Sequence, residues 1–135
     1  MPFVRCFYHV IWATKYRAPL ITPDVERALL QTVREKSQML GCPILAIEAV
    51  EDHIHVAVAN VPRIAVAEWV RQVKGLSSRQ INALFPDREL RFAWQESYGV
   101  LTFGAKNLEF VVEYVNRQKA HHAANTLEMY LEQTE

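Results

Sequence analysis

The sequence is poor in cysteine and has no long apolar run, and both absences argue against whole classes of protein. Cys6 and Cys42 form no CxxC pair, which argues against a disulfide framework and a thiolate metal site. We expect both to be small core residues. The apolar runs fall well short of the ~20 residues of a membrane-spanning helix. The N-terminal stretch MPFVRCFYHV lacks the layout of a signal peptide, so we expect a cytoplasmic protein.

The chain also lacks any net charge, but its charge is unevenly distributed. Residues 1–19 carry three basic residues and no acidic one, and residues 61–92 carry six basic and three acidic residues. Residues 20–60 and 93–135 each carry three basic and six acidic residues. A neutral protein with this distribution can still present a basic surface locally.

Low-complexity segments, internal repeats and linkers are absent as well, so we expect a single domain over residues 1–135. Alternating β-branched and aromatic stretches predict strands, and apolar residues at helical spacing predict helices. Thr22 and Pro23 are typical of a helix start, and Gly41 of a helix end. The predicted elements, in chain order, are a strand in 3–13, a helix over 22–40, strands over 43–50 and 53–59, a helix over 64–84, one or two short strands within 91–104, and a long helix from 106 to about 132.

This order predicts an α+β fold, in which an antiparallel sheet is covered by helices in a ferredoxin-like or RRM-like arrangement. The last helix has an apolar stripe that includes Val111 and Val115. Tyr114 and Gln118 are four residues apart, so they lie on one face of that helix, at the shoulder of the stripe. By themselves they are typical of a border that half-covers a core.

Two histidines occupy the strand HIHVAVA. Side chains alternate along a strand, so His53 and His55 project from the same face, roughly 6–7 Å apart at Cα. Two imidazoles at this spacing can reach one metal ion. Two histidines without a ligand give the same pattern, but buried histidine is uncommon unless its nitrogens have partners.

Five segments in this order carry a resemblance over nearly the whole chain: YHVIWATKYRAPLI, DHIHV, WVRQVKGLSSRQI, WQESYGVLTFG and EYVNRQ. Together they resemble the small single-tyrosine HUH transposases of bacterial and archaeal insertion sequences. In that family the C-terminal helix carries the tyrosine. One departure is that Glu51 precedes Asp52, where the family often has Pro-Asp.

The resemblance implies an enzyme that cuts single-stranded DNA at the ends of a mobile element and rejoins it through a 5′-phosphotyrosine. It implies that Tyr114 is the nucleophile and that His53, His55 and Gln118 hold Mg²⁺ or Mn²⁺. The chemistry is consistent with this, because tyrosine has a pKa of ~10 and a divalent ion can stabilise the leaving 3′ oxygen. Asp52 either accepts a hydrogen bond from a ligand imidazole or is only a turn residue, and the turn is favoured.

The resemblance also implies partners, namely single-stranded DNA with hairpin ends and a second copy of the chain. In such a homodimer the tyrosine helix of one subunit serves the metal site of the other. Tyr16, Trp94 and Tyr98 are candidates for stacking on bases, with core packing favoured for the tryptophan. His121 and His122 are expected to be an exposed pair. The candidates for phosphate contacts are Lys15, Arg17, Arg71, Lys74 and Arg79.

Other functions fit parts of the pattern. A non-catalytic DNA- or RNA-binding module on the same fold, or a domesticated transposase, would keep the sheet and the basic residues. A two-histidine phosphodiesterase would need a second histidine motif, which His9, His121 and His122 do not supply. The binding module would not need Tyr114 and Gln118 near the histidine strand.

Overall fold

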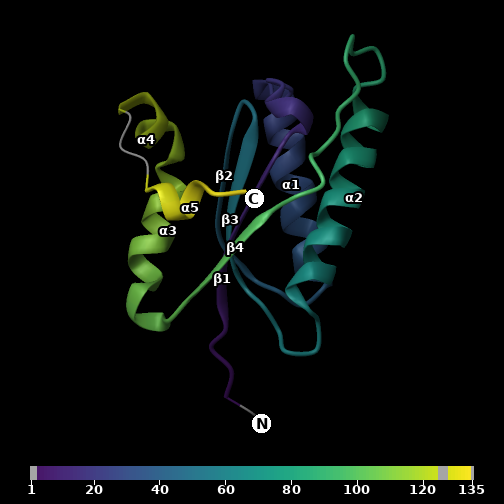
Figure 1. The fold of residues 1–135 in the computed structure, drawn as a ribbon. Helices are drawn as coiled ribbons and strands as arrows, with labels where there is room; N and C mark the ends of the chain where they lie inside the picture. Colours follow the sequence, from purple (N-terminus) through teal and green to yellow (C-terminus); the bar gives the residue numbers. More distant parts are fainter. Residues whose placement is uncertain (1–2, 125–127, 135) are drawn as a thin grey trace.

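The computed structural model describes residues 3–124 and 128–134, and its first six elements follow the predicted order of strands and helices (Figure 1). Three short helices then follow on the C-terminal side, and two 3-10 turns, Lys15–Arg17 and Ala105–Asn107, precede α1 and α3. The elements are β1 (Phe7–Ala13), α1 (Pro23–Met39), β2 (Ile44–Val50), β3 (His53–Ala59), α2 (Val66–Leu84), β4 (Gly99–Phe103), α3 (Leu108–Asn116), α4 (Gln118–Ala124) and α5 (Met129–Glu132).

The four strands form one antiparallel sheet in the order β2-β3-β1-β4. The two central strands are therefore β3 and β1, and His55 lies opposite Ile11 in their register. A βαββαβ chain with this strand order has the ferredoxin-like topology, which confirms the predicted fold class.

Helices cover both faces of the sheet: α1 and α2 lie on one face, and α3, α4 and α5 on the other (Figure 1). Alternation in β3 sends Ile54 and Val56 into the large apolar core with α1 and α2. The opposite positions, His53 and His55, face the C-terminal helices, beside a smaller apolar cluster that contains Ala57. A strand that is covered on both faces therefore uses one face for packing and the other for polar groups.

The first helix begins and ends where the sequence predicts. Pro23 is its first residue, and the carbonyl of Thr22 accepts the backbone N–H of Glu26 at 2.8 Å. The Thr22 hydroxyl does not cap the backbone but donates to the Asp24 carboxylate. Gly41 follows the helix with φ of 78°, a left-handed conformation that glycine adopts at little cost.

The predicted long helix from 106 to about 132 is wrong. Helix α3 ends at Asn116, and Arg117 adopts φ −111° and ψ 25°, outside the helical region. The chain continues as α4 and then returns across the sheet as α5, which packs on β1 and β4 (Figure 1). The predicted helix includes residues 125–127, which lie outside the described residues.

Smaller corrections concern the ends of the sheet and the cysteines. The first strand begins at Phe7, and Trp94 forms only an isolated bridge with Thr14. Cys42 is buried as expected, whereas Cys6 is exposed. Among the described residues, no helix is both long enough and apolar enough to span a bilayer.

Candidate active site

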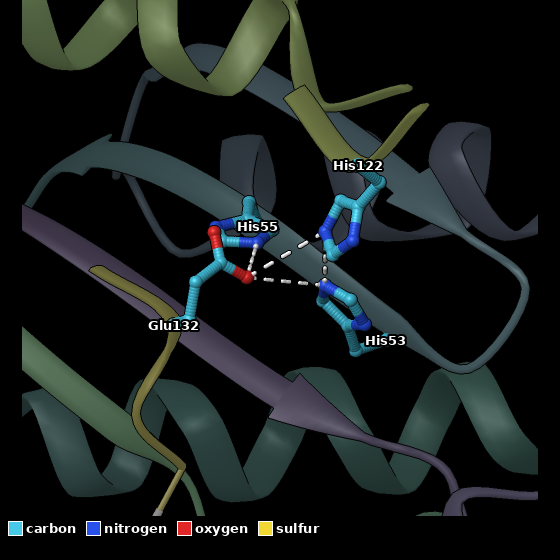
Figure 2. A group of neighbouring side chains, drawn as sticks. All are labelled: His53, His55, His122 and Glu132. Atoms are coloured by element: carbon cyan, nitrogen blue, oxygen red, sulfur yellow. Dashed lines mark hydrogen bonds and ion pairs between the residues drawn. The ribbon is translucent and has the colours of Figure 1, made fainter. Parts of the chain in front are cut away.

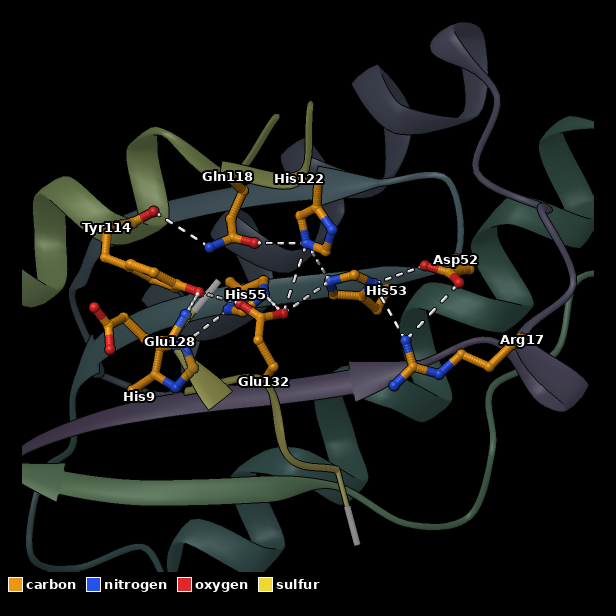
Figure 3. Close-up of polar contacts among 10 residues, drawn as sticks. All are labelled: His9, Arg17, Asp52, His53, His55, Tyr114, Gln118, His122, Glu128 and Glu132. Carbon is orange, nitrogen blue, oxygen red and sulfur yellow. Dashed lines mark hydrogen bonds and ion pairs between the residues drawn. The ribbon is translucent and has the colours of Figure 1, made fainter. Parts of the chain in front are cut away.

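The two histidines of β3 lie side by side beneath the C-terminal helices (Figure 3). Their side chains are almost fully buried, with 3% of His53 and none of His55 exposed. Each imidazole has a polar partner at both ring nitrogens, as burial requires. The rings are close neighbours, with centroids 5.1 Å apart.

Asp52 orients the first of these rings. Its Oδ1 lies 2.7 Å from Nδ1 of His53 and accepts a hydrogen bond from it. The guanidinium of Arg17 is nearby, 3.4 Å from the same nitrogen and 3.8 Å from Asp52 Oδ2. Asp52 is thus both a turn residue and an acceptor that fixes the ring. With the proton on Nδ1, the neutral ring presents the lone pair of Nε2 to the site.

A third histidine, His9 of β1, supports the second ring. Its Nε2 shares a hydrogen bond of 2.8 Å with Nδ1 of His55, and it is itself buried. Burial, reinforced by His55, lowers the pKa of His9 to about 3, and burial lowers the pKa of His55 to about 4. Both rings are therefore neutral near pH 7. The sequence prediction missed His9, because strand alternation gives its face but not the neighbouring strand.

Glu132 and His122 complete a cluster with the two strand histidines (Figure 2). Oε1 of Glu132 lies 3.0 Å from His55 Nε2, 3.4 Å from His53 Nε2 and 3.6 Å from His122 Nε2. His122 Nε2 lies 3.1 Å from His53 Nε2. The sequence prediction missed Glu132 as a site residue, and the expectation that His122 is exposed is wrong. One ligand atom from each of the four lies within 4.8 Å of the others, so these residues fit a divalent ion.

Tyr114 projects from α3 into the same site. Its hydroxyl donates to Oε2 of Glu132 and accepts the backbone N–H of Glu128 at 2.9 Å. Its side chain is buried, whereas the helical spacing alone is typical of a half-exposed residue at the border of the core. The ring of His121 stacks on the Tyr114 ring, with centroids 4.6 Å apart. Burial, together with the hydrogen bond to Glu132, raises the pKa of Tyr114 to about 12. The resting hydroxyl is therefore protonated.

Gln118 is fully buried one turn beyond Tyr114. Its amide oxygen lies 3.0 Å from His122 Nε2, and its amide nitrogen donates to the carbonyl of Tyr114 at 3.3 Å. The oxygen therefore faces the cluster, as Figure 3 shows. The predicted role of Gln118 as a metal ligand stays a prediction.

The predicted phosphate contacts fall into two groups. Arg17 lies beside the histidine cluster, and Lys15 is exposed in the same 3-10 turn. Tyr16, between them, is 90% exposed and has φ of 59°, and the Lys15 ammonium lies 5.5 Å from the centroid of its ring.

The other group lies on α2, on the opposite face of the sheet. Arg71, Lys74 and Arg79 line a cavity of about 510 Å³ between this helix and residues 91–98. Arg71 is paired with Glu68. The Lys74 ammonium is half-buried and donates to the backbone carbonyls of Gln95, Glu96 and Ser97, which argues against a phosphate contact for that residue. The DNA-binding roles of this group stay predictions.

The buried neutral histidines predict a stability that falls in acid. In the unfolded chain His9 and His55 have the ordinary pKa of 6.5, whereas their folded values are about 3 and about 4. Above about pH 6.5 their contribution is fully present. As the pH falls from there toward about 4, the free energy of unfolding should fall by roughly 1.4 kcal/mol per pH unit for each histidine.

Urea unfolding of the metal-free protein between about pH 7.5 and about pH 4.5 measures this loss. In His9→Gln the slope of the free energy of unfolding against pH should decrease by the contribution of one histidine, roughly 1.4 kcal/mol per pH unit. A free energy of unfolding that stays constant over this range would contradict the burial of two neutral imidazoles.

Comparison with known proteins identifies the family to which the sequence is similar. Residues 3–118 match the family described as "Transposase IS200 like". The ISDra2 transposase TnpA of Deinococcus radiodurans is 26% identical over 115 residues, which cover 82% of each chain. The transposase for insertion sequence element IS200 of Salmonella typhimurium is 29% identical over 118 residues, or 84% of this chain and 77% of the relative.

Solved structures agree with the sequence match. A putative transposase from Deinococcus radiodurans R1 superposes with a TM-score of 0.71 at 28% identity, covering 87% of this chain and 95% of the other. A REP-associated tyrosine transposase bound to a REP hairpin shares the fold, with a TM-score of 0.65 at 14% identity over 90% of this chain and 72% of the other. With its ferredoxin-like sheet and a family match over most of its length, this chain belongs to the IS200-like transposase family.

Proposed function

We propose that the protein cleaves and rejoins single-stranded DNA through a covalent bond between Tyr114 and a 5′ phosphate, with the help of a divalent ion. One observation carries the proposal: a single carboxylate, that of Glu132, contacts the Tyr114 hydroxyl with one oxygen and the imidazoles of β3 with the other. The proposed nucleophile and the proposed metal-binding nitrogens therefore lie on either side of one carboxylate group. Membership of a transposase family supports a DNA-cleaving and rejoining enzyme.

In this proposal the imidazoles of His53 and His55 hold Mg²⁺ or Mn²⁺, and the amide oxygen of Gln118 is the predicted third ligand. Such an ion, when bound, neutralises charge on the scissile phosphate and stabilises the leaving oxygen. Asp52 and His9 keep the two imidazoles oriented through their second nitrogens. The site residues thus separate into groups that bind the ion and groups that fix those ligands.

Tyr114 supplies the covalent step. Its Oη attacks phosphorus, the Oη–P bond forms, and the P–O3′ bond breaks. The bonding electrons go to the 3′ oxygen, which takes up a proton, while the hydroxyl proton of the tyrosine is lost. The phosphotyrosine conserves the energy of the broken bond, so attack by a 3′-OH rejoins the strand without ATP. Because the pKa of Tyr114 is raised to about 12, the hydroxyl is protonated before the reaction and has to lose its proton as it attacks.

The proposed partners are single-stranded DNA with hairpin ends and a second copy of the chain. The relative solved with a REP hairpin shares this fold, which supports DNA hairpins as a ligand class. Within one chain, the Tyr114 ring already lies 6.1 Å from the ring of His55. Each chain can therefore place its own tyrosine at its own histidines. In a homodimer with a trans arrangement, the two chains would exchange α3, and each tyrosine would take the equivalent position in the partner.

A denaturing gel with labelled oligonucleotides tests the function. The protein is mixed with Mn²⁺ and single strands taken from the ends of its own element, with the matching duplexes and EDTA as controls. A shifted covalent band with single strands, lost in EDTA, is the expected result. Binding of the same strands without a covalent band would favour the competing reading, a non-catalytic or domesticated DNA-binding module.

A further inference from the structure

We infer that the C-terminal segment 128–134 is part of the metal centre, with Glu132 as a carboxylate ligand and His122 as a third imidazole ligand beside His53 and His55. This inference rests on the proposed function, since it concerns the ion of the same site. It also indicates which chemical class of metal ion the site binds. Both residues lie beyond residue 118, where the family match ends.

The spacing of the four ligand atoms is that of a coordination shell. Ligands about 2.1 Å from an ion are about 3.0 Å apart in octahedral and about 3.4 Å apart in tetrahedral geometry. Oε1 of Glu132 lies 3.0 Å from His55 Nε2 and 3.4 Å from His53 Nε2, and His122 Nε2 lies 3.1 Å from His53 Nε2. Three of the neighbouring pairs therefore have the separations expected around one ion.

Hydrogen bonds alone account poorly for these contacts. In the tautomer in which His53 Nδ1 donates to Asp52, Nε2 of the same ring has only a lone pair. That lone pair faces both a carboxylate oxygen and a second imidazole nitrogen (Figure 2). A cation placed among these three atoms attracts each of them, and no proton is needed between them.

The segment that carries Glu132 is held in place at several points. Leu131 is buried, and the carbonyl of Thr134 accepts the Ser97 hydroxyl at 2.6 Å. The backbone of Gln133 lies so close to β4 that a Cβ at Gly99 would stand 1.8 Å from its carbonyl oxygen. The close approach needs glycine at that position, and it fixes the path of the chain next to Glu132.

The ligand set indicates the class of ion. Three imidazoles and one carboxylate suit transition ions, Zn²⁺ above all, and they suit Mn²⁺ better than Mg²⁺, which prefers oxygen ligands and keeps several waters. The amide oxygen of Gln118, 3.0 Å from His122 Nε2, lies at the edge of this set. Of the two ions that the family resemblance implies, the cluster therefore favours Mn²⁺.

Isothermal titration of the full chain with Mn²⁺ tests the role of Glu132. Glu132→Gln keeps the size of the side chain but removes its charge, and it should raise the Kd for Mn²⁺ at least about tenfold. Glu128→Gln is the matched control, because the Glu128 side chain is exposed and the residue contacts Tyr114 only through its backbone N–H. A Kd for Glu132→Gln within about twofold of wild type would overturn the inference.

A pair of glycine variants tests the segment without altering any ligand. Gly99→Ala forces the backbone of Gln133 away and should also raise the Kd for Mn²⁺, whereas Gly104→Ala, with open space around its Cβ, should not. Hydrogen exchange of residues 128–134 reports whether the segment has moved. Faster exchange in Gly99→Ala with an unchanged Kd would overturn the inference.

The covalent-adduct assay separates this inference from the proposed function. Wild-type Mn²⁺ affinity in Glu132→Gln, together with adduct formation by the wild-type chain, would remove Glu132 from the metal centre and leave the transposase chemistry intact. Weakened Mn²⁺ binding in that variant, without any adduct from the wild-type chain, would support the metal centre and count against the chemistry.

Discussion

Replacing Tyr114 by phenylalanine should abolish the covalent protein–DNA band, a loss of at least about a thousandfold in adduct formation. The change removes only the hydroxyl, so the ring still packs against His55 and His121. Glu132 and the Glu128 N–H each lose a partner, which should lower the free energy of unfolding by about 1–3 kcal/mol. The variant should therefore still fold and bind DNA. The gel assay and a thermal melt measure the two effects.

Tyr16→Phe is the matched control, because Tyr16 is exposed and a phenylalanine ring stacks on bases equally well. This variant should form the adduct at the wild-type level. Residual covalent band in Tyr114→Phe would mean that another side chain is the nucleophile, and the proposed chemistry at this site would then be wrong.

Replacing His53 or His55 by alanine should abolish cleavage at every Mn²⁺ concentration that supports the wild-type enzyme. Each variant removes a nitrogen that faces Glu132 Oε1 in the cluster, so the ion loses a ligand that added metal cannot replace. The expected loss is at least about a thousandfold in cleavage rate.

Thermal melting gives this prediction a readout that does not depend on DNA. Because an ion that binds only the folded state raises its stability, Mn²⁺ should raise the Tm of the wild-type protein. The same concentration should raise the Tm of His53→Ala much less. Cleavage at the wild-type rate by either variant, with Tm still raised by Mn²⁺, would show that the ion binds elsewhere.

The sequence was sufficient for those features that depend on neighbouring residues. Alternation within one strand placed His53 and His55 on one face. The four-residue spacing brought Tyr114 and Gln118 to the same site, although Gln118 begins α4, beyond the break at Arg117. Proline and glycine marked both ends of α1. The family resemblance then linked the strand and the helix, which spacing within single elements cannot do.

The features that the sequence did not reveal depend on the path of the whole chain. His9 reaches His55 only because β1 is the neighbour of β3 in the sheet. His122 and Glu132 reach the site only because the chain leaves the helix at Arg117 and returns. Residues 105–135 contain no glycine or proline, so nothing local marked that break.

The two-sided burial of β3 links the chemistry of the protein to the register of its sheet. A shift of one residue in the pairing with β1 would turn His53 and His55 into the apolar layer and present Ile54 and Val56 to Tyr114. Both layers would fail together. Imidazoles buried without hydrogen-bond partners would destabilise the core, and a site lined by aliphatic side chains could not bind a metal ion. An incorrectly paired chain thus has neither a stable core nor a metal-binding site, and selection for activity is at the same time selection for one register.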